Sequence, residues 1–210
     1  EVSVSSDVCP EIREYERFTT TVVNAYIKPL MSNYLKKLDQ KLLNSGFNCP
    51  LLLMTSGGTL TNISSACNNP VRLVESGPAG GAILATSIAE DMNLSKVISF
   101  DMGGTTAKIT IIENKKAIKA REFEVDRKAR FKKGSGYPLR IPVIEMVEIG
   151  AGGGSIARVN KLEQIITGPD SAGSFPGPAC YSNGGSMPTI TDADLVIGKI
   201  DPNNFAGGKI

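Results

Sequence analysis

The segment Asp-Met-Gly-Gly-Thr-Thr at residues 101–106 combines the residue types that bind a phosphate group. Glycine lets the backbone approach a ligand closely and adopt positive φ, so successive N–H groups can converge on an anion. The two threonines add hydroxyl groups, and the aspartate adds a carboxylate after the apolar run Val97 to Phe100. Polar residues at the tip of a buried strand need a partner. We therefore predict a phosphate-contacting loop; a plain hairpin turn is the alternative for Gly103-Gly104.

A second glycine-rich segment, Gly-Ala-Gly-Gly-Gly-Ser at residues 150–155, holds four glycines in six residues. Its backbone could wrap around a nucleotide or a substrate, and the alternative is a flexible hairpin. Apolar runs that are typical of strands lie on both sides of it, which favours the functional interpretation.

The chain contains no histidine, which removes the commonest general acid/base and the commonest zinc ligand. Any catalysis by these residues must use carboxylates, Lys or Arg, hydroxyls, backbone amides and a hard cation. The carboxylate candidates are Glu75, Glu145, Glu148, Asp192 and Asp194. Asp192 also suits the N-cap or first turn of a helix. Cys180 lies in an apolar loop, and we expect a packed thiol there.

Length and composition indicate a globular protein without a nucleic-acid surface. The 210 residues are 41% hydrophobic with a formal net charge of +2, and acidic or apolar residues interrupt the basic clusters. The four scattered cysteines predict reduced thiols, and no apolar run reaches the roughly 18 residues of a membrane span. We expect a cytoplasmic protein. Because the chain begins with Glu, we also expect it to be a piece of a longer polypeptide.

The first part of the chain, residues 1–95, reads as helical and βα structure. Apolar residues recur at helical spacing over 12–43 and predict a long amphipathic helix. Its buried stripe is expected to consist of Val23, Tyr26, Ile27, Leu30, Met31, Tyr34, Leu35, Leu38 and Leu42. Pro29 predicts a kink or a break within it. A strand is expected at 51–54, and a helix capped by the Ser76 hydroxyl is expected to follow.

The second part, residues 96–210, reads as strands around glycine turns. We expect three antiparallel strands at 97–100, 107–112 and 117–125, and two more at 142–149 and 156–160. A long ordered loop over 168–185 and a last helix over 192–200 should complete it.

The order strand, glycine turn, strand at residues 97–112 excludes two common phosphate sites. A Walker loop and a dinucleotide-binding turn both require a helix after the glycines. The remaining architecture is the actin, sugar-kinase and Hsp70-like ATPase fold, an α/β fold of the ribonuclease H-like kind with a mixed sheet flanked by helices. In that fold an acidic residue at the strand end positions the water shell of magnesium, which is the role expected of Asp101.

Taken together, the motifs resemble the hydantoinase A/5-oxoprolinase family, which includes N-methylhydantoinase ATP-hydrolysing subunits and acetone carboxylase β subunits. The matching stretches cover nearly the whole chain and occur in the family's order. They are Pro10–Arg17, Thr20–Tyr26, Val74–Gly81, Phe100–Thr105, Gly150–Ile156, Pro176–Tyr181 and Thr191–Ala193.

The resemblance implies ATP-dependent opening of a cyclic amide or imide of the hydantoin or 5-oxoproline type, through phosphorylation of the carbonyl oxygen. Mg²⁺ would be bound through Asp101. The ATP-contacting residues would be Gly103, Gly104, Thr105, Thr106, Gly150, Gly152, Gly153, Gly154 and Ser155. A hydantoinase B-like second subunit or domain would share the reaction. An ATP-dependent ketone carboxylase subunit and a non-catalytic nucleotide-binding scaffold are the alternatives.

The chain departs from the family pattern in three places. Many members have a histidine shortly before the glycines of residues 150–155, where Val147 and Glu148 stand here, so that histidine's role is not transferred. Others have Ser-Asn-Gly-Gly where this chain has Ser56-Gly57-Gly58, which leaves the ring that is opened unassigned. The family's first Asp-x-Gly-Gly-Thr segment is also absent from these residues, so we expect it to precede them.

Overall fold

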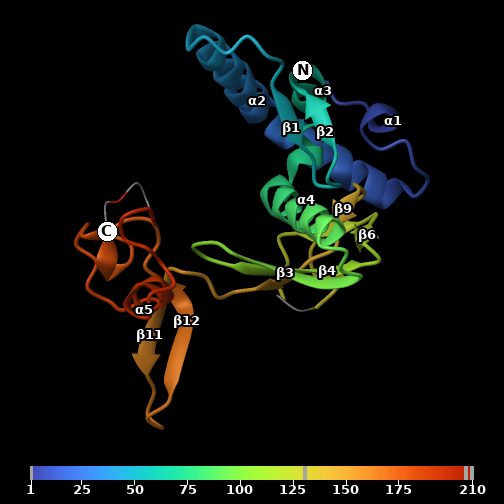
Figure 1. Cartoon of the computed structure of the whole chain (residues 1–210). Coiled ribbons are helices and arrows are strands. Elements are labelled where there is room, and N and C mark those ends of the chain that lie inside the picture. Colours follow the sequence, from blue (N-terminus) through green and yellow to red (C-terminus); the bar gives the residue numbers. More distant parts are fainter. Residues whose placement is uncertain (1, 130–131, 206–207, 209–210) are drawn as a thin grey trace. The chain divides into compact units, whose positions relative to one another are not determined.

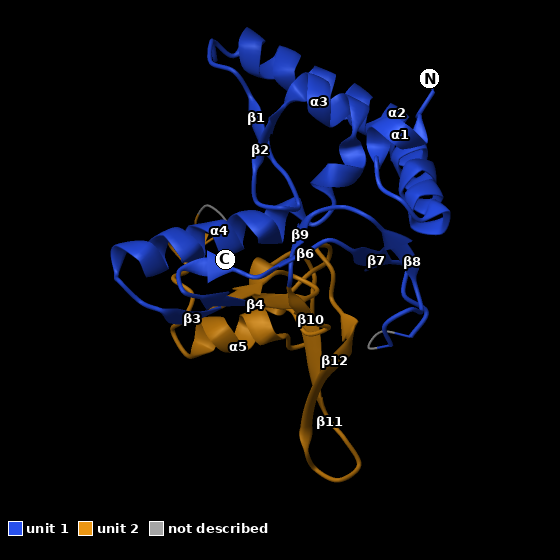
Figure 2. Cartoon of the chain, turned by 90° about the vertical axis from the view of Figure 1, so that its right-hand side faces the viewer, with its two compact units in different colours: residues 1–98, 110–145 blue, residues 99–109, 146–210 orange. Residues whose placement is uncertain are grey.

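The computed structural model describes residues 2–129, 132–205 and 208. The chain forms two compact units, which are described separately. Unit 1 holds residues 1–98 and 110–145, and unit 2 holds residues 99–109 and 146–210 (Figure 2). Each unit is made of two separate stretches of the sequence. The division of the chain near residue 95 stays a prediction.

Unit 1 carries most of the helices (Figure 1). Its elements are α1 (Ser5–Val8), α2 (Glu14–Asn44), β1 (Leu52–Met54), β2 (Leu60–Asn62), α3 (Ile63–Asn68), the 3₁₀ turn η1 (Pro70–Leu73), α4 (Ser76–Asp91), β5 (Lys116–Ala117), β6 (Lys119–Ala120), β7 (Phe123–Val125), β8 (Tyr137–Leu139) and β9 (Val143–Ile144). The strands β3 (Lys96–Met102) and β4 (Ala107–Glu113) have residues in both units.

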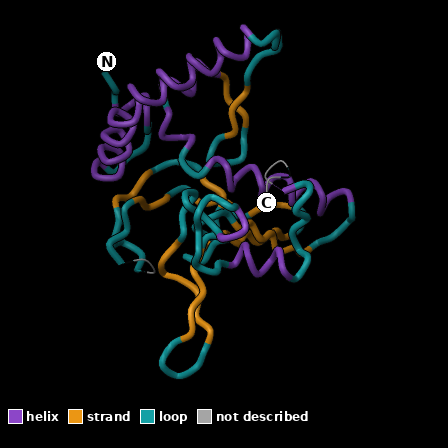
Figure 3. Tube along the Cα trace, turned by 90° about the vertical axis from the view of Figure 1, so that its left-hand side faces the viewer, coloured by secondary structure: helices purple, strands orange, loops and turns teal. Residues whose placement is uncertain are grey.

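Strands and loops make up most of unit 2. Figure 3 shows where helices, strands and loops follow one another along the whole described chain. It contains β10 (Val147–Ile149), β11 (Ser155–Val159), β12 (Ile165–Ser171), the 3₁₀ turn η2 (Ala179–Tyr181) and α5 (Ile190–Val196). In Figure 2 the antiparallel β11–β12 hairpin extends as an arm from the rest of this unit. The prediction of a loop over 168–185 is therefore partly wrong, because the first residues of this range form the end of β12.

The long helix α2 is confirmed, but its buried face matches the predicted stripe only in part. The helix continues without a break through Pro29, and the buried positions are Thr20, Asn24, Ser32 and Leu35. Three of these four side chains are polar, and each bonds to a backbone group of another element. The helix thus packs against its neighbours through directed hydrogen bonds as well as through apolar contact.

Three members of the predicted apolar stripe are exposed along α2. Tyr26 is 84% exposed, Leu30 is 73% exposed and Tyr34 is 57% exposed. Other members are covered as predicted, since Leu35 is buried and Val23 and Ile27 pack against the core of unit 1. Contacts with α3, η1 and β8 cover the side of the helix that carries its buried polar residues. Periodicity alone could not place the edge of this buried face, because polar and apolar positions both repeat at intervals of about four residues.

Two small apolar clusters form the core of unit 1. The larger combines Val8, Val71, Leu139, Ile141 and Val143. The smaller combines Leu35, Ala66 and Cys67. Among the described residues, no helix combines the length and the apolar character needed to cross a bilayer.

The sheet next to the first glycine turn has the order β10–β4–β3, with β5 also paired to β4. Residues 117–125 do not form the single third strand that was expected. They divide into short strands with different partners, since β6 pairs with β9 and β7 pairs with β8. The strand expected at 142–149 likewise divides into β9 and β10, because the backbone between them leaves one sheet and joins another.

Strand β3 is longer and more exposed than the buried strand that was predicted. Ile98 is 70% exposed and Phe100 is 58% exposed, so one face of this strand lacks a covering layer in the described chain. The start of α4 also differs, because Glu75 is the N-cap with φ of 60° and no side chain caps the helix. The last helix begins at Ile190, capped by Thr189.

The buried amide of Asn24 gives a test of how α2 is attached. Its Nδ2 donates to the Asn68 carbonyl at 3.0 Å, and its Oδ1 accepts from the Val71 N–H at 3.2 Å. Asn24→Ala leaves the Val71 N–H buried without an acceptor. The substitution should therefore lower the free energy of unfolding by about 1–3 kcal/mol. Urea unfolding would measure it.

Asn33→Ala is the matched control, since Asn33 is exposed on the same helix. It should change stability by less than about 0.5 kcal/mol. Equal effects of the two substitutions would contradict the assignment of Asn24 as an anchor of α2.

Candidate functional site

The first glycine loop, residues 101–106, closes the hairpin between β3 and β4. The Gly103 N–H donates to the Thr106 carbonyl at 2.9 Å, which fixes a tight turn. Asp101 lies near the end of β3 and is exposed, as is Thr105 at the tip of the turn. The predicted order of strand, glycine turn and strand is therefore confirmed.

The backbone N–H groups of Gly104, Thr105 and Thr106 have no acceptor within the residues that the structure describes. The hydroxyl groups of the two threonines also make no hydrogen bond there. Three amides and two hydroxyls in one turn form a donor-rich surface with no carboxylate hydrogen-bonded to it. Such a set of donors suits an anion with several oxygens, such as a phosphate group.

The glycines of this turn are not required by the fold of the chain itself. Neither Gly103 nor Gly104 has φ in the left-handed region. A Cβ added to Gly104 would meet no atom within 4 Å, and one added to Gly103 would reach only the Thr106 carbonyl at 3.5 Å. The space beside both glycines is thus open, which fits close approach of a ligand to the backbone.

Asp101 is the carboxylate that could hold a metal ion beside this loop. No group of three or more His, Cys, Asp or Glu side chains gathers elsewhere within the described ranges. Mg²⁺ characteristically uses one or two protein carboxylates, keeps several waters and binds substrate phosphates. One exposed carboxylate next to free amide donors fits such a phosphate-bound ion.

The second glycine loop, residues 150–155, lies directly against the first. The Gly153 N–H donates to the Gly103 carbonyl at 2.9 Å, and the Gly154 N–H donates to the Gly104 carbonyl at 2.8 Å. The structure therefore brings together the two glycine motifs, which are some 50 residues apart in the sequence. Both belong to unit 2.

The amide groups of the second glycine loop are largely used within the protein. The Gly152 N–H donates to Ser155 Oγ at 3.0 Å, and the Ser155 N–H donates back to the Gly152 carbonyl at 2.9 Å. The Gly153 carbonyl accepts from the Thr191 N–H, and the Gly154 carbonyl accepts from the Ala172 N–H. Ser155 is buried, and Gly150 joins the loop to β10. Direct contact of this loop with ATP stays a prediction.

Asp192 supports the loops that surround the second glycine loop. Its carboxylate accepts from the Cys180 N–H at 2.7 Å and from the Thr189 N–H at 2.7 Å, and Thr189 Oγ1 caps the helix in return. Partial burial raises the pKa of Asp192, but hydrogen bonds from Cys180 and Thr189 outweigh it and lower the pKa overall. Asp192 is thus the first-turn acid that the sequence predicted.

The Cys180 thiol is a poor nucleophile in this environment. Burial, a hydrogen bond to Asp192 and the charge of that carboxylate raise the pKa of Cys180 to about 11. A thiol reacts as its thiolate, so very little reactive form exists near neutral pH. The prediction of a packed thiol is supported.

The contact between Thr191 and the second glycine loop is the part of the site that sequence reasoning missed. Thr191 is buried, and its N–H holds the Gly153 carbonyl. A signal existed in the sequence, because Thr189-Ile-Thr-Asp192 has the spacing of a capping box.

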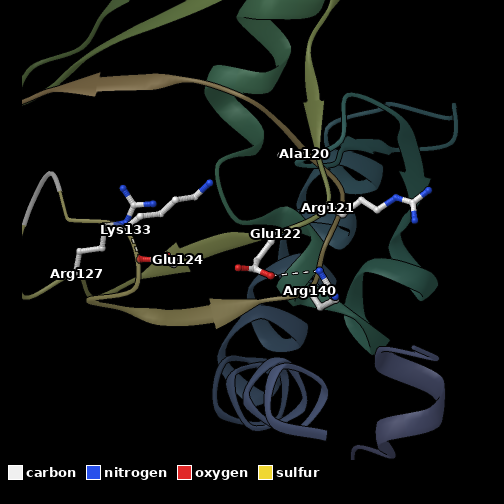
Figure 4. A pocket seen from close by; sticks show the side chains of 7 residues that line it. All are labelled: Ala120, Arg121, Glu122, Glu124, Arg127, Lys133 and Arg140. Carbon is white, nitrogen blue, oxygen red and sulfur yellow. Dashed lines mark hydrogen bonds and ion pairs between the residues drawn. The ribbon is translucent and has the colours of Figure 1, made fainter. Parts of the chain in front are cut away.

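The cleft in Figure 4 belongs to unit 1 and has a volume of about 290 Å³. Its lining residues are Ala120, Arg121, Glu122, Glu124, Arg127, Lys133 and Arg140. Arg127 pairs with Glu124 at 3.1 Å, and Arg140 pairs with Glu122 at 3.2 Å. The hydrogen bond from the Gly134 N–H lowers the pKa of the buried Glu124, and the charge of Arg127 lowers it further. These ion pairs neutralise much of the charge of the residues that line the cleft. No residue of either glycine loop lines the cleft.

Comparison with known proteins agrees with the arrangement of motifs. The family model described as Hydantoinase/oxoprolinase matches residues 17–210. An uncharacterized protein of Methanocaldococcus jannaschii is 48% identical over the whole of this chain and 31% of its own length. Caprolactamase subunit alpha of Pseudomonas jessenii is 35% identical over 97% of this chain and 28% of its own length.

Two solved structures share the fold. Nucleotide-free acetone carboxylase is similar with a TM-score of 0.75 and 26% identity, over 98% of this chain and 28% of that one. The ATP-dependent caprolactamase of Pseudomonas jessenii has a TM-score of 0.70 and 35% identity, over all of this chain and 29% of that one. The predicted mixed α/β, actin-like ATPase-type fold is confirmed. The chain spans about a third or less of these relatives.

The lowered pKa of Asp192 predicts a pH-dependent contribution to stability. A carboxyl group with a lowered pKa in the folded state stabilises fully above its unfolded pKa, near 3.9, and loses that contribution as the pH falls through the folded value. Asp192→Asn should lower the free energy of unfolding by about 1–2 kcal/mol at pH 7, and by less towards pH 3. Urea unfolding across pH 3–7 would measure this difference.

Asp194→Asn is the control, because the Asp194 carboxylate on the same helix forms a 3.6 Å ion pair with the exposed Lys199 side chain. Its effect should stay below about 1 kcal/mol. A difference between wild type and Asp192→Asn that does not shrink at low pH would contradict the role of the carboxylate charge.

Proposed function

The chain belongs to the hydantoinase/oxoprolinase family, and we propose from this premise that it forms part of an enzyme that uses ATP to open a cyclic amide or imide. The observation that carries the proposal is the first glycine loop, where three free amides and two hydroxyls adjoin the Asp101 carboxylate. Relatives named caprolactamase and 5-oxoprolinase support this class of substrate.

In the proposed reaction, the amides of Gly104, Thr105 and Thr106 bind phosphate oxygens of ATP. Asp101 would hold the water shell of Mg²⁺, and the ion would neutralise charge on those phosphates. The γ-phosphoryl group passes to the carbonyl oxygen of the ring, and ADP leaves. Water then adds to the carbonyl carbon and the C–N bond breaks, with a proton passing to the nitrogen, which leaves an acyl phosphate. A second water hydrolyses this acyl phosphate to a carboxylate and inorganic phosphate.

A second subunit or domain of the hydantoinase B type is proposed to complete the active site. Two relatives bear the names caprolactamase subunit alpha and acetophenone carboxylase gamma subunit, and these names support the proposal of a partner subunit. The chain lacks histidine, so a general base for water would be a carboxylate of this chain or a residue of the partner.

Asp101→Asn tests the proposed metal-binding role. In the full-length protein with its second subunit, it should lower substrate-dependent ATP hydrolysis by about 100-fold or more, because charge stabilisation at the phosphates is lost. Release of phosphate and melting temperature should be measured together, so that a loss of activity is separated from a loss of folding.

Asp170→Asn makes the same chemical change at an exposed ion pair with Arg158 on the β11–β12 arm. It should leave turnover within about twofold, as expected of a surface pair. Unchanged turnover in Asp101→Asn would rule out the proposed role of Asp101.

A ketone carboxylase subunit is the second candidate, because nucleotide-free acetone carboxylase shares the fold and a gamma subunit of acetophenone carboxylase is 31% identical over this chain. The full-length enzyme should be assayed with a lactam or hydantoin in water, and with a ketone plus bicarbonate. Product that requires bicarbonate would favour the carboxylase. Binding of Mg-ATP without turnover of either substrate would favour a non-catalytic scaffold.

A further inference from the structure

The contact between the two glycine loops assigns a different role to each of them. We infer that residues 152–154 of the second glycine loop are positioning residues, which orient the phosphate donors of the first loop and do not themselves bind the nucleotide. This inference rests on the proposed function, because it concerns the ATP site of that enzyme.

The orientation follows from the geometry of the peptide bond. The bonds from Gly103 to Gly104 and from Gly104 to Thr105 are trans, since the cis bonds of the described chain lie elsewhere. In a trans peptide group the C=O and the N–H point in opposite directions. Gly153 and Gly154 hold the carbonyls of Gly103 and Gly104, so the N–H groups of Gly104 and Thr105 must both face away from the second loop.

Close packing explains why the second loop consists of glycines. A Cβ on Gly152 would lie 2.5 Å from the Thr105 nitrogen, where no rotamer change could relieve the contact. A Cβ on Gly153 would lie 2.6 Å from Thr191 Oγ1. None of the three glycines has φ in the left-handed region, so space, and not backbone conformation, requires glycine here.

The hydrogen bonds of the second loop support the same conclusion. Its amides at 152–155 all donate within the protein, so none is free to bind a phosphate without breaking an existing bond. The free donors and the open space both lie on the first loop. One loop therefore has the chemistry of a ligand site, and the other has the packing of its support.

The contact with Thr191 allows a test by rescue. Gly153→Ala places a methyl group against Thr191 Oγ1 and should displace the loop. Thr191→Ala removes that oxygen, after which the nearest remaining atoms lie at 3.8 Å and 3.9 Å. The double variant should therefore restore the original geometry. If residue 153 contacted the nucleotide, the added methyl group would still obstruct binding in the double variant.

Mg-ATP binding to the full-length protein should be measured by calorimetry for wild type, Gly153→Ala, Thr191→Ala and the double variant. We expect Gly153→Ala to weaken binding by about tenfold and the double variant to recover to within about threefold of wild type, as relief of overpacking predicts. Gly152→Ala should weaken binding whether or not Thr191 is trimmed, because its contact is with backbone.

Two results would overturn the inference: normal binding by Gly153→Ala, or equally weak binding by Gly153→Ala and the double variant when both are folded. If Gly153→Ala does not fold, Gly154→Ala is compared with Gly154→Ala plus Ser171→Ala, since a Cβ on Gly154 meets Ser171 Oγ at 2.8 Å. Recovery of binding should then be partial, because the same Cβ also lies 3.0 Å from the Gly104 carbonyl, and no recovery would overturn the inference.

If the wild-type protein does not bind Mg-ATP, the proposed function is contradicted. The positioning role of the second glycine loop is then tested by a second measurement that needs no nucleotide. Hydrogen exchange of the amides at 153 and 154, measured without nucleotide, reports directly on their bonds to the first loop. Gly153→Ala should accelerate exchange at 154, and Thr191→Ala should restore protection in the double variant. Unaltered exchange in Gly153→Ala would refute the positioning role.

Discussion

The two hydrogen bonds that join Gly153 and Gly154 to the carbonyls of Gly103 and Gly104 are the contact on which the site depends. A short turn with free amides has many accessible conformations, and most would not aim neighbouring N–H groups in one direction. Bonding two successive carbonyls removes much of that freedom. The donors are therefore oriented before any anion arrives, which is the condition for strong electrostatic binding.

Residues at and near the start of helix α5 support this contact. Asp192 bonds to Thr189 and Cys180, and the neighbouring Thr191 amide holds the Gly153 carbonyl. A carboxylate that reads as a catalytic candidate in the sequence is thus a structural anchor, and its hydrogen bonds lower its own pKa. The same carboxylate helps to keep the Cys180 thiol protonated, so neither residue is available for chemistry in the way its type alone would allow.

Sequence reasoning predicted the features that depend on local chemistry. The hairpin at residues 101–106, the helix at 14–44 and the first-turn position of Asp192 all follow from turn, periodicity or capping rules. It predicted Leu35 on the buried face of α2 but missed Asn24 and Ser32, because these polar side chains bond to backbone groups of distant segments. It also could not distinguish the two glycine loops, since their difference depends on which atoms lie where a Cβ would be.

The open space beside Gly103 and Gly104, set against the crowding at residues 152–154, has an evolutionary consequence. Substitutions in the second loop disturb packing, so selection for a folded chain acts against them in every descendant. Substitutions at the first pair leave the fold intact, so only selection for the ligand acts against them. A lineage that abandoned the chemistry but kept the protein should therefore lose the first pair of glycines while it retains the other three.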